Sequence, residues 1–214
     1  MADTLTRSQV LERQPAGWEV LLVAIEALYA TGDFATGLAF VERIGAAAEA
    51  ADHHPDVTLT YPSVHVRLLS HDAGGVTERD LALATTISGI AAELGISATP
   101  ERLSRIEIGL DAHDHPAVGA FWAAVLGYEV DDADVVDPQG RQVTLWLQET
   151  DAHDEPRQRF HVDITVPPDQ AQPRIDAALA AGGTLVSEER APAFVVLADP
   201  EGNKVCVCTS LGRD

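Results

Sequence analysis

The sequence predicts an α+β protein of two domains, an antiparallel sheet covered by helices and then a repeated strand–helix–strand unit. Three observations lead to this expectation. The first hundred residues alternate helix-like and strand-like patterns in the order α-β-β-α-β-β-α. The rest of the chain twice contains a strand, a helix, further strands, an Asp-Pro-x-Gly turn and a final strand. A length of 214 residues is sufficient for two domains of ordinary size.

The first domain is predicted from local periodicity and helix-end signals. Asp33 is a suitable N-cap for the long second helix, and Thr77 opens the third. Gly95 suits the end of that helix and Pro100 prevents its continuation, so we place the boundary near residue 101. This gives domains of residues 1–100 and 101–214. The predicted elements are a helix (5–14), two strands (18–29), a helix from residue 34 up to the histidine pair at 53–54, two strands (59–61 and 64–68) and a helix (77–94).

The second domain is predicted from its internal repeat. Each half begins with an alternating apolar strand, continues through a helix and ends with a strand after an Asp-Pro-x-Gly turn. The two turns hold the same place in the two halves, which makes a chance repeat a poor explanation. The segments are a strand (106–110), a helix (116–126), a turn (137–140) and a strand (143–147), then a strand (160–166), a helix (about 169–181), a turn (199–202) and a strand (204–208).

The composition is that of a globular protein with an acidic surface. Hydrophobic residues make up 46% of the chain, and the formal net charge is −20. Such a surface repels phosphate backbones and anionic lipids, so we expect neither nucleic acid nor membrane as a partner. No apolar run reaches the ~20 residues of a membrane helix, and residues 1–7 lack the form of a signal peptide. With Cys206 and Cys208 expected to be reduced, these observations predict a cytoplasmic protein.

A cluster of histidines marks the candidate site of the first domain. Half of the eight histidines lie between residues 52 and 80. His53 and His54 directly follow the second predicted helix, which Pro55 prevents from continuing. Imidazole gives or takes a proton near neutral pH, and imidazoles backed by a carboxylate such as Asp80 are what general acid–base catalysis requires.

Each of these residues also has a structural interpretation. His53 and His54 could be solvated residues at a helix end, where the helix dipole favours their positive form. Asp80 could complete a capping box at the start of the third helix. His65 lies in the middle of a strand, where a structural role is expected, and His71 could belong to an ordinary loop. The functional interpretation is favoured because all of these residues occur together in one segment.

The segment as a whole resembles the pterin-4a-carbinolamine dehydratases over about residues 5–96. The pieces that carry the resemblance are GDFATGLAFVERIGAAAEAADHHPD, then Tyr61, then VHVRLLSHDAGGVTERDLALA. The resemblance implies a hydro-lyase that converts a 4a-hydroxytetrahydropterin to the quinonoid dihydropterin, with the pterin as substrate and no cofactor. Chemically, loss of water from C4a requires a proton for the leaving hydroxyl and removal of a proton from the ring nitrogen, which imidazoles can perform.

The resemblance also implies roles for individual residues. The pair His54 and His71 is the expected acid–base pair, with His53 beside it and Asp80 orienting a histidine. Which histidine is the acid and which the base stays open. One departure is Val57, where some members of the family carry an aromatic residue. The residues expected to bind substrate are Asp52, Pro55, Tyr61 and Asp72.

The same resemblance offers an alternative of another class. Some members of the family also act as dimerisation partners of a transcription factor, so the first domain could be an interaction module. Retention of His53, His54 and His71 argues for catalysis, because a scaffold would not need them. The family further implies self-association of the first domain, and we therefore expect a homo-oligomer.

The second domain resembles the vicinal-oxygen-chelate superfamily, and within it the glyoxalase-like domains, over about residues 104–210. The pieces that carry the resemblance are AFWAAVLGYEV, FHVDITV and VVLADPEGNKVCV. The resemblance implies two βαβββ modules that form a cupped sheet around a cavity, and hence an unknown small-molecule ligand. A third hypothesis accordingly makes small-molecule binding or lyase activity in this domain the main function of the chain.

Metal-dependent members of that superfamily place one ligand on each of four strands. Our approximate match puts Glu107, Trp146 or nearby Gln148, His161 and Cys206 at these positions. Tryptophan is not a metal ligand, so we expect no catalytic metal, with Glu107, His161 and Cys206 as the weak candidates. Two further groups of ligand-type residues, at 111–115 and 151–155, are expected to be solvated loops.

Overall fold

The chain forms two compact units. The computed structural model describes residues 3–126, 128–151, 160–180, 183–198 and 204–213. The first unit is made of residues 1–104 with 210–214, and the second of residues 105–209. The predicted boundary near residue 101 lies just before this division, but residues 210–214 group with the first unit. That each unit folds alone stays a prediction.

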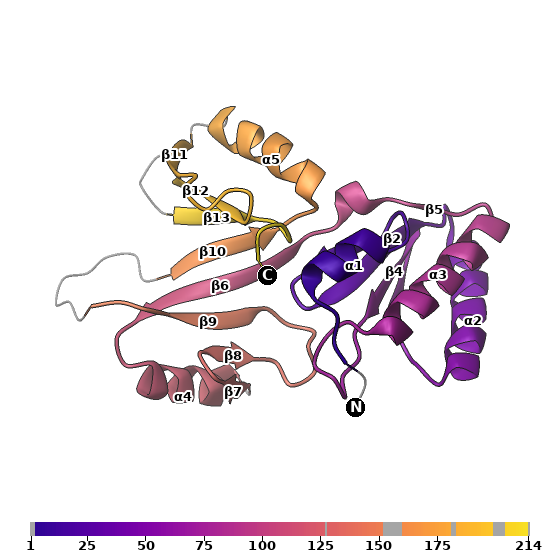
Figure 1. The fold of residues 1–214 in the computed structure, drawn as a ribbon, viewed down its shortest axis with the longest axis horizontal. Helices are drawn as coiled ribbons and strands as arrows, with labels where there is room; N and C mark the ends of the chain where they lie inside the picture. The colour runs from indigo at the N-terminus through magenta and orange to yellow at the C-terminus, as the bar shows by residue number, and fades with distance from the viewer. Residues whose placement is uncertain (1–2, 127, 152–159, 181–182, 199–203, 214) are drawn as a thin grey trace. The chain divides into compact units, whose positions relative to one another are not determined.

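The first unit has the predicted order of helices and strands (Figure 1). Its sheet is antiparallel with the order β1-β2-β4-β3, and a short strand that was not predicted, β5 (Ser97–Ala98), pairs with β2. A 3₁₀ turn, Pro100–Arg102, follows. The elements are α1 (Arg7–Arg13), β1 (Glu19–Leu21), β2 (Ala24–Ala30), α2 (Phe34–Ala51), β3 (Asp56–Thr60), β4 (Ser63–Leu68) and α3 (Glu78–Glu93).

The predicted helix starts are confirmed by their capping bonds. The Asp33 carboxylate accepts a hydrogen bond from the Thr36 amide at 2.7 Å at the start of α2. Thr77 caps α3, and the side chain of Asp80 returns a bond to the Thr77 amide, which completes a capping box. Helix α2 continues to Ala51, just before the histidine pair, as predicted.

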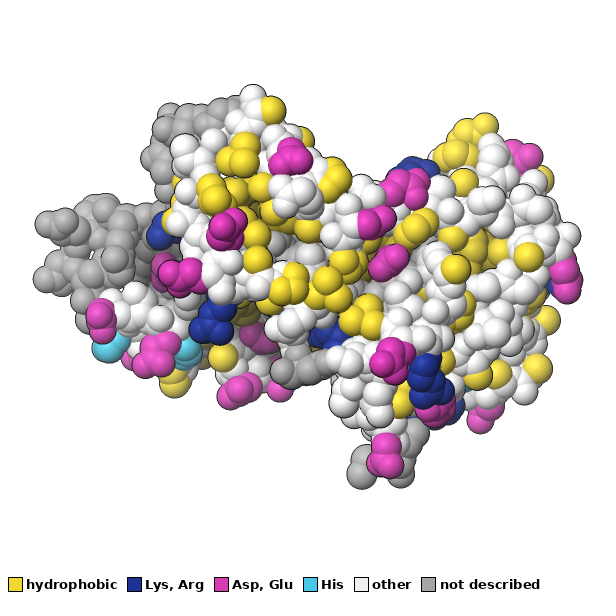
Figure 2. All heavy atoms as spheres, turned by 45° about the horizontal axis from the view of Figure 1, so that its top comes forward, with side chains coloured by type: hydrophobic (Ala, Val, Ile, Leu, Met, Phe, Trp, Pro, Cys, Tyr) yellow, Lys and Arg dark blue, Asp and Glu magenta, His cyan; other side chains and the backbone are white. Residues whose placement is uncertain are grey.

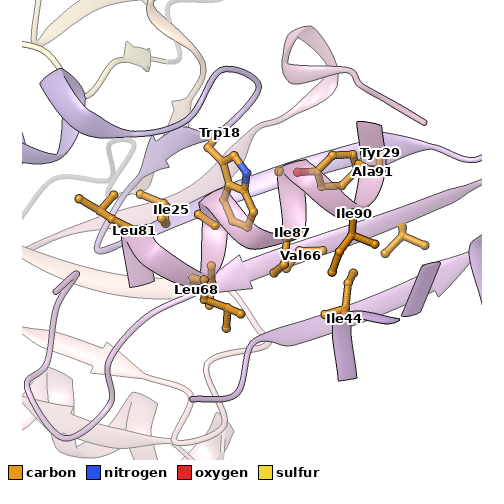
Figure 3. Close-up of a cluster of buried hydrophobic side chains, with 14 of the residues drawn as sticks. Trp18, Ile25, Tyr29, Ile44, Val66, Leu68, Leu81, Ile87, Ile90 and Ala91 are labelled. Atoms are coloured by element: carbon orange, nitrogen blue, oxygen red, sulfur yellow. The ribbon is translucent and has the colours of Figure 1, made fainter. Parts of the chain in front are cut away.

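One face of the first sheet holds the core. Val64, Val66 and Leu68 of β4 alternate toward this face and are fully buried against the helices, as Figure 3 shows for two of them beside Ile44 and Ile87. Trp18 and Tyr29 complete the layer, and the Trp18 indole N–H donates to the Ser88 hydroxyl at 2.9 Å. The intervening residues of β4, such as His65, point to the other face.

The second unit is built from two βαβββ modules, as predicted. The sheet order is β11-β12-β13-β10-β6-β9-β8-β7, in which the first and last strands of each module pair in parallel. The modules join through the antiparallel pair β6–β10 (Figure 1). The elements are β6 (Arg105–Ala112), α4 (His115–Leu126), β7 (Glu129–Asp131), β8 (Asp134–Val136) and β9 (Thr144–Glu149), then β10 (Phe160–Thr165), α5 (Pro168–Ala180), β11 (Thr184–Ser187), β12 (Phe194–Ala198) and β13 (Lys204–Cys208).

The two faces of the second sheet differ in chemistry. Apolar residues on one face pack against the helices; they include Leu110 and Leu147 near α4, and Leu197 and Val207 near Ile175 of α5. Because side chains alternate along a strand, the opposite face receives the polar set of β6, β10 and β13. The predicted metal candidates are on this polar face, which is described below.

Two sequence expectations about loops and surfaces can be compared with the structure. Residues 111–115 are not a single loop, because β6 runs through Ala112 and α4 begins at His115. Residues 152–155 and the turn 199–202 lie outside the described residues.

Acidic side chains are scattered over the visible face in Figure 2. Among the described helices, no segment combines the length and hydropathy needed to cross a membrane.

Candidate active site

The end of α2 sends the two histidines in opposite directions. Asp52 adopts the left-handed conformation, with φ 47° and ψ 40°, and the His53 amide donates to the Ala48 carbonyl at 3.1 Å. This six-to-one bond closes the helix in the manner of a Schellman motif, with Asp tolerated at a position that favours glycine. The reversal buries the His53 side chain, whereas the His54 side chain is 57% exposed.

Asp80 is the carboxylate to which Ser70, Thr77 and His53 are hydrogen-bonded. It is fully buried in the first turn of α3. Its Oδ2 atom accepts hydrogen bonds from the Ser70 hydroxyl at 2.7 Å and from the amide and hydroxyl of Thr77 at 2.7 and 3.1 Å. Its Oδ1 atom lies 2.8 Å from His53 Nε2. Asp80 therefore completes the capping box and orients a histidine at the same time.

The hydrogen bond to Asp80 determines which ring nitrogen of His53 carries a hydrogen. A carboxylate only accepts hydrogen bonds, so the bond to Asp80 Oδ1 requires a hydrogen on His53 Nε2. The second ring nitrogen, Nδ1, is then an acceptor in the neutral imidazole and a donor once the ring is protonated. A histidine held in this way has one nitrogen committed to orientation and one available for proton transfer.

The turn from Ser70 to Gly75 brings two more predicted residues to this region. Ser70 and Gly75 form a β-bridge, and the Ser70 hydroxyl anchors the turn to Asp80. His71 directly follows Ser70 and is exposed. Asp72 accepts a hydrogen bond from the Arg79 guanidinium at 2.5 Å.

The electrostatics of Asp72 connect this turn with the buried histidine. The hydrogen bond from Arg79 lowers the pKa of the exposed Asp72 carboxyl below its ordinary value. The charge of Arg79 lowers this pKa further, and so does the positive form of His53. The turn and the buried histidine therefore interact electrostatically.

His54 and Tyr61, two other predicted site residues, lie outside the buried group around Asp80. His54 Nε2 pairs with the Glu49 carboxylate at 3.1 Å on the exposed side of α2. Tyr61 is 71% exposed at the end of β3 away from the histidine pair. A five-residue strand spans roughly 16 Å, so the structure does not bring Tyr61 to His53. Val57, the departure from the family pattern, packs on the core side of the same strand.

His65 has the structural surroundings expected of a mid-strand histidine. Its Nε2 atom lies 2.8 Å from a carboxylate oxygen of Glu26, which is 2% exposed on the neighbouring strand β2. Arg67 lies two residues further on the same face and binds Asp56 of β3 at 3.0 Å. This polar group crosses the sheet on the face opposite the core and is separate from the Asp80 group.

Some residues of the site were missed from the sequence. Ser70 and Thr77 surround Asp80 with hydroxyl donors, and Glu49 and Arg79 hold His54 and Asp72. Arg79 could have been found as the residue directly before Asp80 in an exposed turn of a helix. Ser70 gives no signal of its own, because its contact depends on how the turn folds onto α3.

The polar face of the second sheet carries the predicted metal candidates. Glu107 of β6 lies opposite Asp163 of β10, and Asp163 lies opposite Cys206 of β13. The ligand atoms of His161, Asp163 and Cys206 lie within 4.8 Å of one another. Trp146, at one of the four positions where a ligand was expected, contacts the His161 ring edge-on with centroids 5.1 Å apart. Neither cysteine is in a disulfide.

Comparison with known proteins covers both units. The family described as pterin 4 alpha carbinolamine dehydratase matches residues 3–90, and the family described as glyoxalase-like domain matches residues 107–208. A protein of Thermomicrobium roseum named "Putative pterin-4-alpha-carbinolamine dehydratase" is 43% identical over 89 residues, which cover 42% of this chain and 95% of that protein. A protein of Koribacter versatilis with the same name is 45% identical over 74 residues, covering 35% of this chain and 79% of its own length.

Two solved structures are similar to part of the chain. A "transcriptional coactivator/pterin dehydratase" from Brucella melitensis is 33% identical and covers 42% of this chain and 99% of its own, with a TM-score of 0.39. A glyoxalase/bleomycin resistance protein/dioxygenase superfamily member from Vibrio splendidus is 19% identical and covers 50% of this chain and 99% of its own, with a TM-score of 0.33. By the sequence matches, the chain belongs to the pterin-4a-carbinolamine dehydratase family through its N-terminal domain, which is followed by a glyoxalase-like domain at residues 107–208.

Proposed function

We propose that the first unit dehydrates a 4a-hydroxytetrahydropterin to the quinonoid dihydropterin. In this reaction the C4a–oxygen bond breaks, the hydroxyl leaves as water after gaining a proton, and the ring nitrogen loses a proton. No electrons are exchanged with a cofactor, so the chain needs to supply a base and an acid. The membership of the dehydratase family supports this substrate class.

The observation that carries the proposal is the buried pair of His53 and Asp80. Asp80 fixes the ring of His53 through a 2.8 Å bond and is itself held by Ser70 and Thr77. A histidine oriented by a buried carboxylate is a recurring arrangement for proton transfer, because the carboxylate stabilises the imidazolium that forms. We assign to His53 the removal of the ring-nitrogen proton through Nδ1.

The acid is assigned to an exposed histidine. His54 and His71 are both exposed and exchange protons with water, so an imidazolium that has donated its proton can be recharged. His71 stands beside Ser70, which is bound to Asp80, and this makes it our first choice for the proton donor. His54 lies next in the chain to His53 and pairs with Glu49, and we assign it a supporting role.

The substrate contacts are assigned to the residues around the histidines. Asp52 and Pro55 flank the pair, and Asp72 lies on the turn that follows Ser70. We propose these three as pterin contacts. Tyr61 stays a proposed contact only if a second copy of the chain supplies it, since its own strand carries it away from His53.

The second unit is proposed to bind a small organic molecule on the polar face of its sheet. The aromatic ring of Trp146 beside His161 and Asp163 offers both an apolar surface and charged groups, which is the usual composition of a ligand site. A scaffold role for the chain, as an interaction module, is the alternative that the experiment below separates from catalysis. A homo-oligomer formed through the first unit is part of the same proposal and is measured by light scattering of the purified protein.

The test is a dehydratase assay on the whole protein and on residues 1–104. Because 89 residues of this chain cover 95% of the Thermomicrobium roseum protein, the first unit corresponds to a nearly complete relative and is expected to fold alone. Both preparations should accelerate carbinolamine dehydration, and His71→Ala should lower kcat by about 10²-fold, the usual scale for a lost acid. His113→Ala, an exposed histidine of the second unit, is the control. A folded protein that binds a partner but leaves the dehydration rate unchanged would favour the scaffold.

A further inference from the structure

The chain before α1 lies against the turn that precedes α3. The Leu5 amide donates to the Val76 carbonyl at 2.8 Å, so residues 4–7 run beside this turn (Figure 1). Gly75 permits the close approach, because a Cβ atom there would lie only 3.0 Å from Thr4 Cγ2. Together with the hairpin between β1 and β2, these segments line a cavity of about 280 Å³ that opens to solvent, which we call the N-terminal pocket.

The walls of the N-terminal pocket are mostly aliphatic. Val10 of α1, Val20 of β1 and Val76 line it and are buried. Val23 also lines it, although its side chain is largely open to solvent. The volume is close to the lower end of the roughly 300–1,000 Å³ range of small-molecule sites. The pocket therefore suits a short molecule with an apolar body.

The hairpin between β1 and β2 has apolar residues where polar ones are expected. Its turn consists of Leu22 and Val23, because Leu21 pairs with Ala24. Leu22 has φ 57°, a left-handed conformation that is rare for bulky residues. Two-residue hairpin turns favour Asn, Asp and Gly, which adopt this conformation readily. A costly conformation is expected where side chains serve a function, and both of these side chains line the N-terminal pocket.

Arg7 gives the N-terminal pocket a positive charge. It is the first residue of α1 and is half-buried. Among the described residues that line the pocket, Arg7 is the one with a charged side chain. The chain as a whole has 34 acidic and 14 basic residues, so a cavity with a guanidinium as its charged group differs from the average surface. Guanidinium groups bind carboxylates and other planar oxyanions.

We propose that the N-terminal pocket binds a small amphiphilic anion, with its apolar body against the valines and Leu22 and its carboxylate-type group at Arg7. The charge of Arg7 and the aliphatic walls together favour this class of ligand, and the volume is too small for a helix or strand of a partner protein. The ligand contacts residues 73–76, which belong to the same turn as His71 and Asp72. The proposal does not depend on the dehydratase assignment, because its test measures binding alone.

The affinities of the whole protein for hexanoate and hexylamine test the proposal. The two probes have the same chain length and opposite charge, and ligand-observed NMR titration gives a Kd for each. Hexanoate should bind about tenfold more tightly, the scale of one hydrogen bond to a charged group. The net charge of −20 attracts the amine to the rest of the surface, so a preference for the anion identifies a local positive site.

Variants locate the binding site. Arg7→Gln should weaken hexanoate binding by about tenfold, whereas Arg43→Gln, at an exposed arginine of α2, should retain the wild-type affinity. The double variant Leu22→Asn, Val23→Gly gives the hairpin a turn that suits its backbone. This variant should melt no earlier than wild type, yet bind hexanoate about tenfold less tightly because the aliphatic contacts are lost.

The results that contradict the proposal follow from the same titrations. A wild-type protein that binds hexanoate no more tightly than hexylamine has no such site. Wild-type affinity for hexanoate in folded Arg7→Gln, or in the folded hairpin variant, would show that the anion binds elsewhere. If a variant does not fold, the comparison of hexanoate with hexylamine on the wild-type protein still decides the question.

Discussion

His53 Nε2 and Asp80 Oδ1 lie 2.8 Å apart although 27 residues separate them in the chain. The contact joins the C-terminal end of α2 to the first turn of α3. It also joins two interpretations of Asp80 that the sequence leaves as alternatives, since the second oxygen of the same carboxylate completes the capping box of α3. One buried side chain thus fixes both a helix start and a histidine.

Asp80→Asn should therefore reduce both stability and activity. The amide can still accept one bond, but its NH₂ group will face a donor at Ser70, Thr77 or His53 and leave a buried polar group unsatisfied. We expect a loss of about 1–3 kcal/mol in the free energy of unfolding and a fall in kcat of at least tenfold. Thermal melting and kcat are measured on one preparation.

Asp33→Ala is the matched control for Asp80→Asn, since it removes a helix N-cap far from the histidines in sequence. It should lower the melting temperature and leave kcat unchanged. An Asp80→Asn protein that melts early but turns over normally would reduce Asp80 to a capping residue.

Replacing Asp52 separates its backbone role from a substrate contact. Its left-handed conformation suits glycine, so Asp52→Gly should keep or raise the melting temperature, and Asp52→Ala should cost about 1–2 kcal/mol. If the carboxylate also binds the pterin, as proposed, both variants should raise KM. An unchanged KM in Asp52→Gly would show that Asp52 only ends helix α2 and does not contact the pterin.

His65→Gln should affect stability more than catalysis. The glutamine amide can still donate to the buried Glu26 carboxylate, so the free energy of unfolding should fall by about 1 kcal/mol and kcat should be preserved. His65→Ala leaves Glu26 without this donor and should cost more. A large loss of kcat in a stable His65→Gln protein would show that His65 belongs to the acid–base set.

The Asp72–Arg79 pair predicts a dependence of stability on pH. The hydrogen bond from Arg79 lowers the pKa of Asp72 in the folded protein below 3.8. A lowered carboxyl pKa stabilises the fold above the unfolded pKa, and this contribution is lost as the pH falls through the folded value. Asp72→Asn should thus melt below wild type at neutral pH, and the two melting curves should converge in acid. A difference that persists at pH 2 would assign the effect to packing.

The sequence predicts those parts of the fold that depend on neighbouring residues. Asp33 and Thr77 mark helix starts because a cap binds amides two or three positions away. The buried face of β4 also depends on nearby residues, since the alternating positions Val64, Val66 and Leu68 are all apolar. Repeated βαβββ order is likewise visible in the chain.

Contacts across the fold could not be predicted in this way. The Ser70 hydroxyl reaches Asp80 only after the turn 70–75 has closed. The reversal at Asp52, which buries His53 and exposes His54, uses a conformation that few aspartates adopt. Tyr61 lies near the histidine pair in sequence, but β3 carries it to the other end of the sheet.

The most direct test of the account is the dehydration rate of the whole protein compared with its His53→Ala variant, with both preparations shown to be folded by circular dichroism. We predict that the wild-type protein accelerates carbinolamine dehydration and that His53→Ala lowers kcat by about 10²-fold or more, while His113→Ala keeps the wild-type rate. A folded His53→Ala protein with the wild-type rate, or a wild-type protein that does not accelerate the reaction, would contradict the assignment.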